Sequence, residues 1–157
     1  MSDKNIVHTD VFTLAASAGQ VREFLRSPER IADYYPGATA YGDFEPGSSY
    51  WILSELGSAL FEILEPRCTE TMVAMHITTS FSKEKPESPA AIKAEPFITM
   101  IEEWDVQPKG TGCEIIKSWM DVELHQMKDL PMADMIRQSA SEEQAVIINA
   151  WNAAATS

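Results

Sequence analysis

Apolar and polar residues alternate with a period of two along much of the chain, which is typical of β-strands with one buried face. Turn residues such as Glu45-Pro46-Gly47 and the stretch 108–112 separate the alternating segments. Residues 82–95 have no clear period, and we expect a long loop there. Strands are predicted over residues 9–15, 38–44, 49–56, 59–64, 69–79, 97–106 and 113–124.

Apolar residues at helical spacing occupy two other parts of the chain. Ser17 is followed by Gln20 in the pattern of a capping box, which predicts a short helix over 18–26. Ser27 and Pro28 fit the first positions of a second short helix that ends before Pro36. The longest apolar stripe predicts a helix over 129–155.

This order of elements indicates an α+β domain that spans residues 1–157. About six to seven strands would form an antiparallel sheet, and only the C-terminal helix is long enough to cover one face of it. A strongly curved sheet around that helix cannot pack tightly everywhere. We therefore expect an apolar cavity between them, which is the usual kind of small-molecule site.

Composition narrows the range of partners. The formal net charge is −12, which disfavours nucleic acid and anionic membrane surfaces, since both attract basic patches. No apolar run is long enough to insert stably in a membrane, and no secretory signal is visible, so a cytoplasmic location is the default. Cys68 and Cys113 are expected to be reduced. The oligomeric state stays open, and a homodimer is compatible with the sequence.

Several short segments resemble the START-like (SRPBCC) superfamily, which includes polyketide cyclases and dehydratases, lipid-transport proteins, coenzyme Q-binding proteins and the major birch-pollen allergen. The segments are Ala15-Ala16-Ser17 with 21–25, 27–30 with 34–37, and 103–106 with 112–115. Cys113 stands where this family usually has Thr. The resemblance implies the helix-grip fold, two short helices after the first strand, and a central cavity for an apolar ligand. The family has no universal catalytic motif, so the resemblance assigns no residue a role.

Three charged residues are candidates for chemistry inside such a cavity. Glu102 alternates with Met100 and Trp104, so one strand register turns it inward, where burial would raise its pKa, and the other register turns Ile101 inward instead. Glu143 lies within the apolar stripe of the last helix. Lys117 would be its counter-charge if it shares a face with Ile115 and Trp119.

The three histidines have different expected surroundings. His8 is expected to be an exposed residue of the N-terminal tail. His76 lies in the middle of a predicted strand, where it is a general base or a ligand partner if it points inward and a surface residue if it points outward. His125 follows the last strand and is expected to be solvated.

Aromatic and methionine side chains are the candidates for the walls of the cavity. For any single one, ordinary core packing is the alternative. The full set of expected ligand-binding residues is Tyr34, Tyr35, Trp51, Trp104, Trp119, Met72, Met100, Met135 and Glu143.

Two classes of function follow, with a third alternative. One is acid–base cyclisation or dehydration of a polyketide-like substrate by Glu102 and His76, with Tyr34 or Trp51 positioning the substrate. The second is a carrier of a lipid, a quinone or a related apolar molecule, without chemistry. The third is an interaction module with a residual cavity. The sequence has no metal-site spacing, nucleophile motif or dinucleotide fingerprint, so no metal or cofactor is expected.

Overall fold

The computed structural model describes residues 5–33, 38–42, 49–55, 57–81 and 89–155. In this part of the chain, seven strands form one antiparallel sheet in the order β1-β7-β6-β5-β4-β3-β2. The strands are β1 Ile6–Leu14, β2 Thr39–Gly42, β3 Ser49–Ser54, β4 Gly57–Ile63, β5 Met72–Ser80, β6 Ile98–Lys109 and β7 Gly112–Leu124. The helices are α1 Ala18–Phe24, α2 Pro28–Ala32, the 3₁₀ helix η1 Glu65–Arg67, α3 Pro89–Ala94 and α4 Met132–Ala155.

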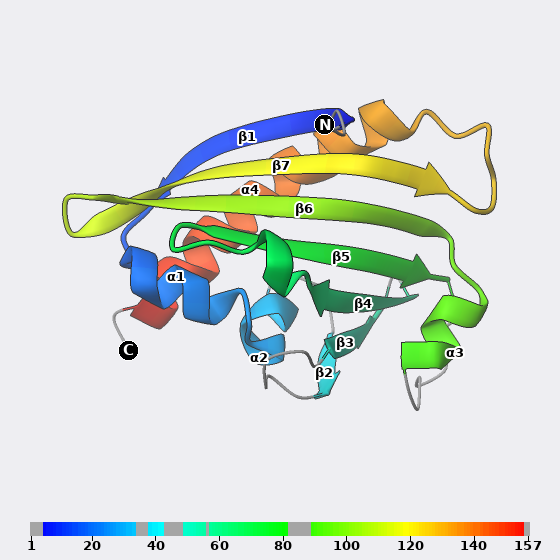
Figure 1. Cartoon of the computed structure of the whole chain (residues 1–157), viewed down its shortest axis with the longest axis horizontal. Coiled ribbons are helices and arrows are strands. Elements are labelled where there is room, and N and C mark those ends of the chain that lie inside the picture. Colours follow the sequence, from blue (N-terminus) through cyan, green and yellow to red (C-terminus); the bar gives the residue numbers. More distant parts are fainter. Residues whose placement is uncertain (1–4, 34–37, 43–48, 56, 82–88, 156–157) are drawn as a thin grey trace.

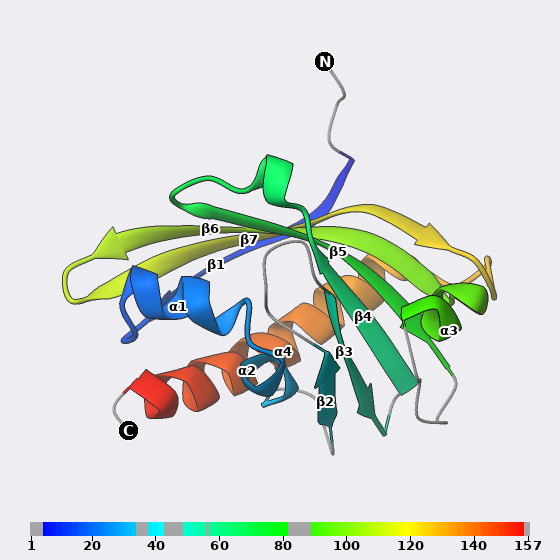
Figure 2. The same ribbon diagram turned by 60° about the horizontal axis from the view of Figure 1, so that its bottom comes forward.

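The sheet bends around α4, which crosses its concave side (Figure 2). Helices α1 and α2 lie beside the C-terminal half of α4, and α3 lies at the other end of the molecule near β4 and β5 (Figure 1). The predicted α+β helix-grip architecture, with two short helices after the first strand, is confirmed. None of the described helices has the length and apolar character that crossing a membrane requires.

The two short helices begin as their sequences predict. The Ser17 hydroxyl accepts a hydrogen bond from the Gln20 backbone N–H, and the Gln20 side chain accepts one from the Ser17 backbone N–H. This reciprocal pair is a capping box, which satisfies two N–H groups at the helix start. Ser27 caps α2 in a similar way through the Arg30 N–H, directly before Pro28. The two caps fix where α1 and α2 begin after β1.

Helix α4 is held to the sheet by one stripe of buried side chains. Ile136, Ala140, Ile147 and Trp151 are buried along it. Trp151 is fully buried, and its ring lies 5.5 Å from the rings of Trp104 in β6 and of Phe24 in α1. Its indole N–H donates to the Arg30 carbonyl oxygen at 3.2 Å. The C-terminal half of α4 is therefore packed tightly against the core.

The structure differs from the sequence-based expectation in several segments: β5 and α4 begin three residues later than predicted, β6 ends three residues later, and η1 was not predicted. The first strand begins at Ile6, three residues earlier than predicted. Part of the predicted loop 82–95 forms α3, whose Ile92 is buried. Residues 82–88 of that loop, and Pro36 at the expected end of the second helix, lie outside the described residues.

Candidate functional site

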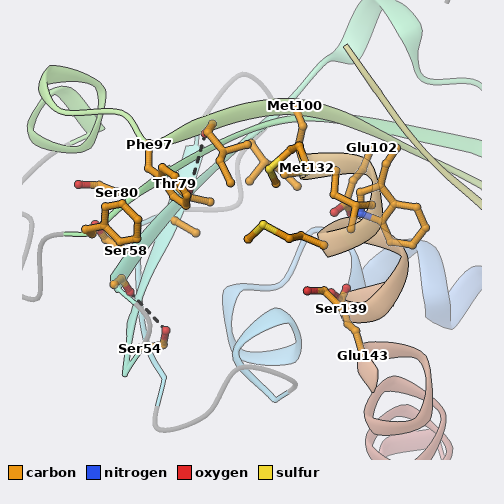
Figure 3. A pocket seen from close by; sticks show the side chains of 18 of the residues that line it. Ser54, Ser58, Thr79, Ser80, Phe97, Met100, Glu102, Met132, Ser139 and Glu143 are labelled. Atoms are coloured by element: carbon orange, nitrogen blue, oxygen red, sulfur yellow. Dashed lines mark hydrogen bonds between the residues drawn. The ribbon is translucent and has the colours of Figure 1, made fainter. Parts of the chain in front are cut away.

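A cavity of about 410 Å³ lies between the N-terminal half of α4 and the concave face of strands β3 to β7. Glu102 and Glu143 lie at one end of it, and Ser54 and Ser58 lie at the other (Figure 3). The wall between these ends is mostly apolar. Its apolar residues include Ala59, Ile77, Phe97, Ile98, Met100, Trp119, Met132, Met135 and Ile136.

Gly57 fixes the backbone at the serine end. Its φ is +124°, and a Cβ atom there would lie 2.2 Å from the carbonyl oxygen of Ser80. Glycine is needed both for this backbone conformation and for this close approach of two strands. The resulting turn places Ser54 of β3 and Ala59 of β4 on the cavity wall.

Glu102 points inward, which decides between the two registers that the sequence left open. It pairs with Met75 of β5 and Trp119 of β7, and its own strand places Met100 and Trp104 on the same face. Glu102 is buried, lines the cavity, and accepts a hydrogen bond at 3.0 Å from the indole N–H of Trp104. A carboxyl group therefore lies at one end of the cavity, opposite the serine end.

Lys117 is the counter-charge of both cavity carboxylates. Its Nζ atom lies 2.6 Å from Oε1 of Glu143 and 3.7 Å from Oε1 of Glu102. The same atom lies 4.4 Å from the ring centroids of Trp104 and Trp119, so the ammonium group lies against two indole faces. Cation–π contact of this kind stabilises a desolvated cation. The arrangement joins β6, β7 and α4 at the end of the cavity.

Burial and neighbouring charges shift the pKa values of Glu102 and Lys117 in defined directions. Burial raises the pKa of Glu102, and the charge of Glu143 adds to this, while the nearby Lys117 charge opposes it. Burial alone would lower the pKa of Lys117, but the charges of Glu102 and Glu143 outweigh it, so the pKa is raised. Lys117 is therefore a firmly protonated ammonium group, and Glu102 retains its proton to a higher pH than a free glutamate does.

Strand β1 adds two polar residues that the sequence analysis missed. Asp10 pairs with Lys117, and His8 pairs with Trp119. His8 Nε2 lies 2.6 Å from Asp10 Oδ1, and the His8 ring lies 5.5 Å from the Trp119 ring. His8 is therefore part of the sheet, and the expectation of an exposed tail is wrong. The alternation of His8, Asp10 and Phe12 is the signal that would have placed both residues beside Lys117.

No model of a known protein family matches the sequence, and no curated protein matches it. Solved structures do resemble it. A START superfamily protein from Mycobacterium smegmatis is 14% identical over 95% of this chain and 96% of that chain, with a TM-score of 0.61. A conserved protein from Geobacillus kaustophilus is 10% identical over 94% of this chain and 93% of that chain, with a TM-score of 0.68. The fold of this chain is START-like.

The chain also resembles the structure of the di-domain ARO/CYC StfQ from the steffimycin biosynthetic pathway. StfQ is 9% identical to this chain, with a TM-score of 0.60, and the similarity covers 97% of this chain and 52% of StfQ. This chain therefore spans about half the length of StfQ. At these identities the similarity establishes the fold and leaves the function to the site itself.

His76 does not reach the START-like cavity. Its neighbour Met75 pairs with Glu102 on the concave face, so the alternation along β5 turns His76 to the convex face. There its Nδ1 lies 3.7 Å from Oε1 of Glu62. The Nζ atom of Lys93 lies 2.9 Å from the other carboxylate oxygen of Glu62, Oε2. The outward alternative is the correct one, and His76 does not line the cavity.

Two of the expected cavity residues also lie on the convex face. Trp51 alternates with the buried, concave-face residues Tyr50 and Ile52, and it pairs with Leu60. Met72 precedes Val73, which pairs with the inward Trp104. Neither Trp51 nor Met72 lines the cavity, because the period of two turns each away from α4.

The other expected residues fall into three groups: one lies in the core, two lie outside the described residues, and four line the cavity. Trp104 is fully buried behind Glu102 and is a core residue. Tyr34 and Tyr35 lie outside the described residues. Trp119, Met100, Met135 and Glu143 do line the cavity, and their role in binding a ligand stays a prediction.

The remaining candidates for chemistry are His125 and the two cysteines. His125 follows the end of β7 and is half-buried, and its Nε2 lies 2.8 Å from the hydroxyl of Thr99 near the start of β6. Cys68 and Cys113 are both free thiols. Within the described residues, no group of His, Cys, Asp and Glu has an arrangement that could hold a metal ion.

Proposed function

We propose that this START-like chain binds a small, largely apolar molecule in the cavity between α4 and the sheet. The observation that carries the proposal is the cavity of about 410 Å³, with apolar walls and polar groups gathered at its ends. Small-molecule sites typically have volumes of about 300–1,000 Å³ and a few polar groups among apolar ones. The resemblance to a START superfamily protein from Mycobacterium smegmatis supports it at the level of the fold.

Blocking the cavity is the direct test of binding. Ser139 is an exposed residue of α4 that lines the cavity. Ser139→Trp would therefore place an indole in the cavity without removing a core residue. We expect the affinity for a fluorescent apolar probe to fall at least tenfold. Native mass spectrometry of the freshly purified protein would show any molecule that co-purifies.

Ser141→Trp is the matched control, because Ser141 is exposed on the same helix and does not line the cavity. This variant should bind the probe as the unchanged protein does. A protein that carries no molecule and takes up no apolar probe would overturn the proposal. The interaction-module alternative would then be favoured.

Acid–base catalysis by Glu102 is the second candidate function. The observation that favours it is a buried carboxyl with a raised pKa that lines the cavity, while Glu143 lies at the same end beside the protonated Lys117. In a dehydration, neutral Glu102 would donate a proton to the leaving hydroxyl, and the Glu143 carboxylate would take the proton from the carbon next to a carbonyl. Water and a conjugated carbonyl product result. StfQ, an ARO/CYC protein with the same fold, supports this candidate.

Glu102→Gln tests this second function. With a β-hydroxyketone as the model substrate, we expect turnover to fall by about 10²–10⁴-fold, because the amide cannot donate the proton that the carboxyl does. The rate is measured as absorbance of the conjugated ketone formed. Turnover by the unchanged protein should also decrease as the pH rises through the raised pKa of Glu102, because the acid form is then lost.

The control for this test is Glu123→Gln, which makes the same chemical change at an exposed position of β7. It should leave turnover unchanged. If Glu102→Gln reacts as fast as the unchanged protein, Glu102 is not the acid. If the unchanged protein shows no turnover at all, the non-catalytic carrier is the better description.

A further inference from the structure

The end of the cavity at Glu102 and Glu143 offers a ligand carboxyl groups and no cationic side chain among the described residues. Glu102 and Glu143 both line the cavity, and no Lys, Arg or His is among the described residues that do. Ser139 supplies a hydroxyl group next to them on α4 (Figure 3). An incoming polar group therefore meets carboxyl oxygens first.

Lys117 is not available to an incoming ligand. Its side chain is only 2% exposed and is not part of the cavity wall. Its ammonium group already contacts Glu143 and Glu102, and two indole faces lie close to it. A ligand carboxylate could reach it only by displacing Glu143 from a 2.6 Å contact.

The balance of charge around Lys117 is also negative. Asp10, opposite Lys117 on β1, adds a further carboxylate near this ammonium group and contributes to raising its pKa. His8 contacts Asp10 and adds positive charge only when it is protonated. With His8 neutral, the carboxylates of Glu143 and Asp10 outnumber the one cation even when Glu102 keeps its proton. A further negative charge would be unfavourable here, because Glu102 and Lys117 are buried, and buried charges interact more strongly than charges in water.

We infer that the molecule bound in this cavity carries a hydrogen-bond donor, a hydroxyl or a protonated amine, as its polar group, and that apolar carboxylates such as fatty acids are rejected. This inference rests on the proposed binding function and names the class of its ligand. A hydroxyl or ammonium group can donate to Glu143 or Glu102 in a charge-assisted hydrogen bond. The apolar remainder of the molecule then lies along Met100, Ile98 and Ile77.

A matched series of ligands tests the inference. The three probes are 2-naphthalenemethanol, 2-naphthylmethylamine and 2-naphthoate, which share one ring system and differ in the polar group. Their affinities would be measured by calorimetry at pH 7. We expect the alcohol and the amine to bind at least tenfold more tightly than the carboxylate. The order of the alcohol and the amine then shows whether the natural donor is neutral or charged.

Glu143→Gln and Glu142→Gln give the matched pair of variants, since Glu142 is exposed on α4 and does not line the cavity. Glu143→Gln should weaken amine binding about tenfold and narrow the gap to the carboxylate, whereas Glu142→Gln should change neither. If Glu143→Gln does not fold, the order of the three probes on the unchanged protein still decides. Equal binding of all three, or tighter binding of the carboxylate, overturns this inference and leaves the binding function standing. Failure of all three probes, together with the apolar fluorescent probe, overturns both.

Discussion

Replacing Lys117 by methionine is expected to lower the free energy of unfolding by about 3–5 kcal/mol, the usual cost of removing one partner from a buried ion pair. Methionine has a similar size and would fill the same space between Trp104 and Trp119. The loss therefore comes from the carboxyl groups of Glu102 and Glu143, which remain without a counter-charge. Urea unfolding followed by circular dichroism at pH 7 measures it.

Two comparisons isolate the electrostatic cause. Lys109→Met removes a lysine whose side chain is 64% exposed, and it should change stability by less than about 0.5 kcal/mol. Adding Glu102→Gln to Lys117→Met should recover part of the loss. A Lys117→Met protein as stable as the unchanged one would show that the buried network contributes little to the fold.

The deficit of Lys117→Met should also depend on pH. The pKa of Glu102 is raised in the folded protein, so its ionisation destabilises the fold as pH rises from the unfolded-state value through the folded one. Without Lys117 that pKa rises further, because the opposing positive charge is gone. The deficit should therefore be smaller at pH 5 than at pH 7.

Replacing Trp151 by alanine is expected to cost about 3–5 kcal/mol, as for other fully buried tryptophans. The indole is fully buried, and it joins α4 to Trp104 of the sheet and Phe24 of α1. Its N–H also satisfies the Arg30 carbonyl in α2. Removing the ring leaves a void where four elements meet, and urea unfolding gives the size of the effect.

Trp151→Phe separates packing from hydrogen bonding. It keeps an aromatic ring among Trp104 and Phe24 but removes the donor to Arg30, so we expect less than half of the loss seen with alanine. A loss below about 1 kcal/mol for Trp151→Ala would contradict the tight attachment of the C-terminal half of α4, since core substitutions of this kind rarely cost so little.

The order of the strands and helices could be predicted from the sequence because the two apolar periods, alternating and helical, are clear in most segments. Helix α3 could not be predicted. Its six residues lack a helical stripe, and it is stabilised by tertiary contacts, with Ile92 buried near β3, β4 and β5. Short helices of this kind depend on packing more than on propensity.

The inward register of Glu102 could be proposed from the sequence but not decided. Both faces of β6 are partly buried: on the convex face Ile101 is half-buried, and Glu103 is buried against Arg67 of η1. A strand that is covered on both sides has no clear polar face to fix its register. For the same reason the direction of His76 on β5 needed the structure. Lys117 could be named from the sequence as the partner of Glu143 only on the condition that it shares a face with Trp119, and the structure meets this condition.

The position of Lys117 between Trp104 and Trp119 has a consequence for optical measurements on the native chain. The emission of an indole depends on the electric field across its ring, and here a charge lies 4.4 Å from two of the four tryptophans. Of these two, only Trp119 also lines the cavity. A molecule that enters beside Glu102 would change the field and the polarity around Trp119 and leave the environment of Trp51 unchanged. The protein therefore contains its own fluorescent reporter of occupancy, and Trp119→Phe would identify its signal.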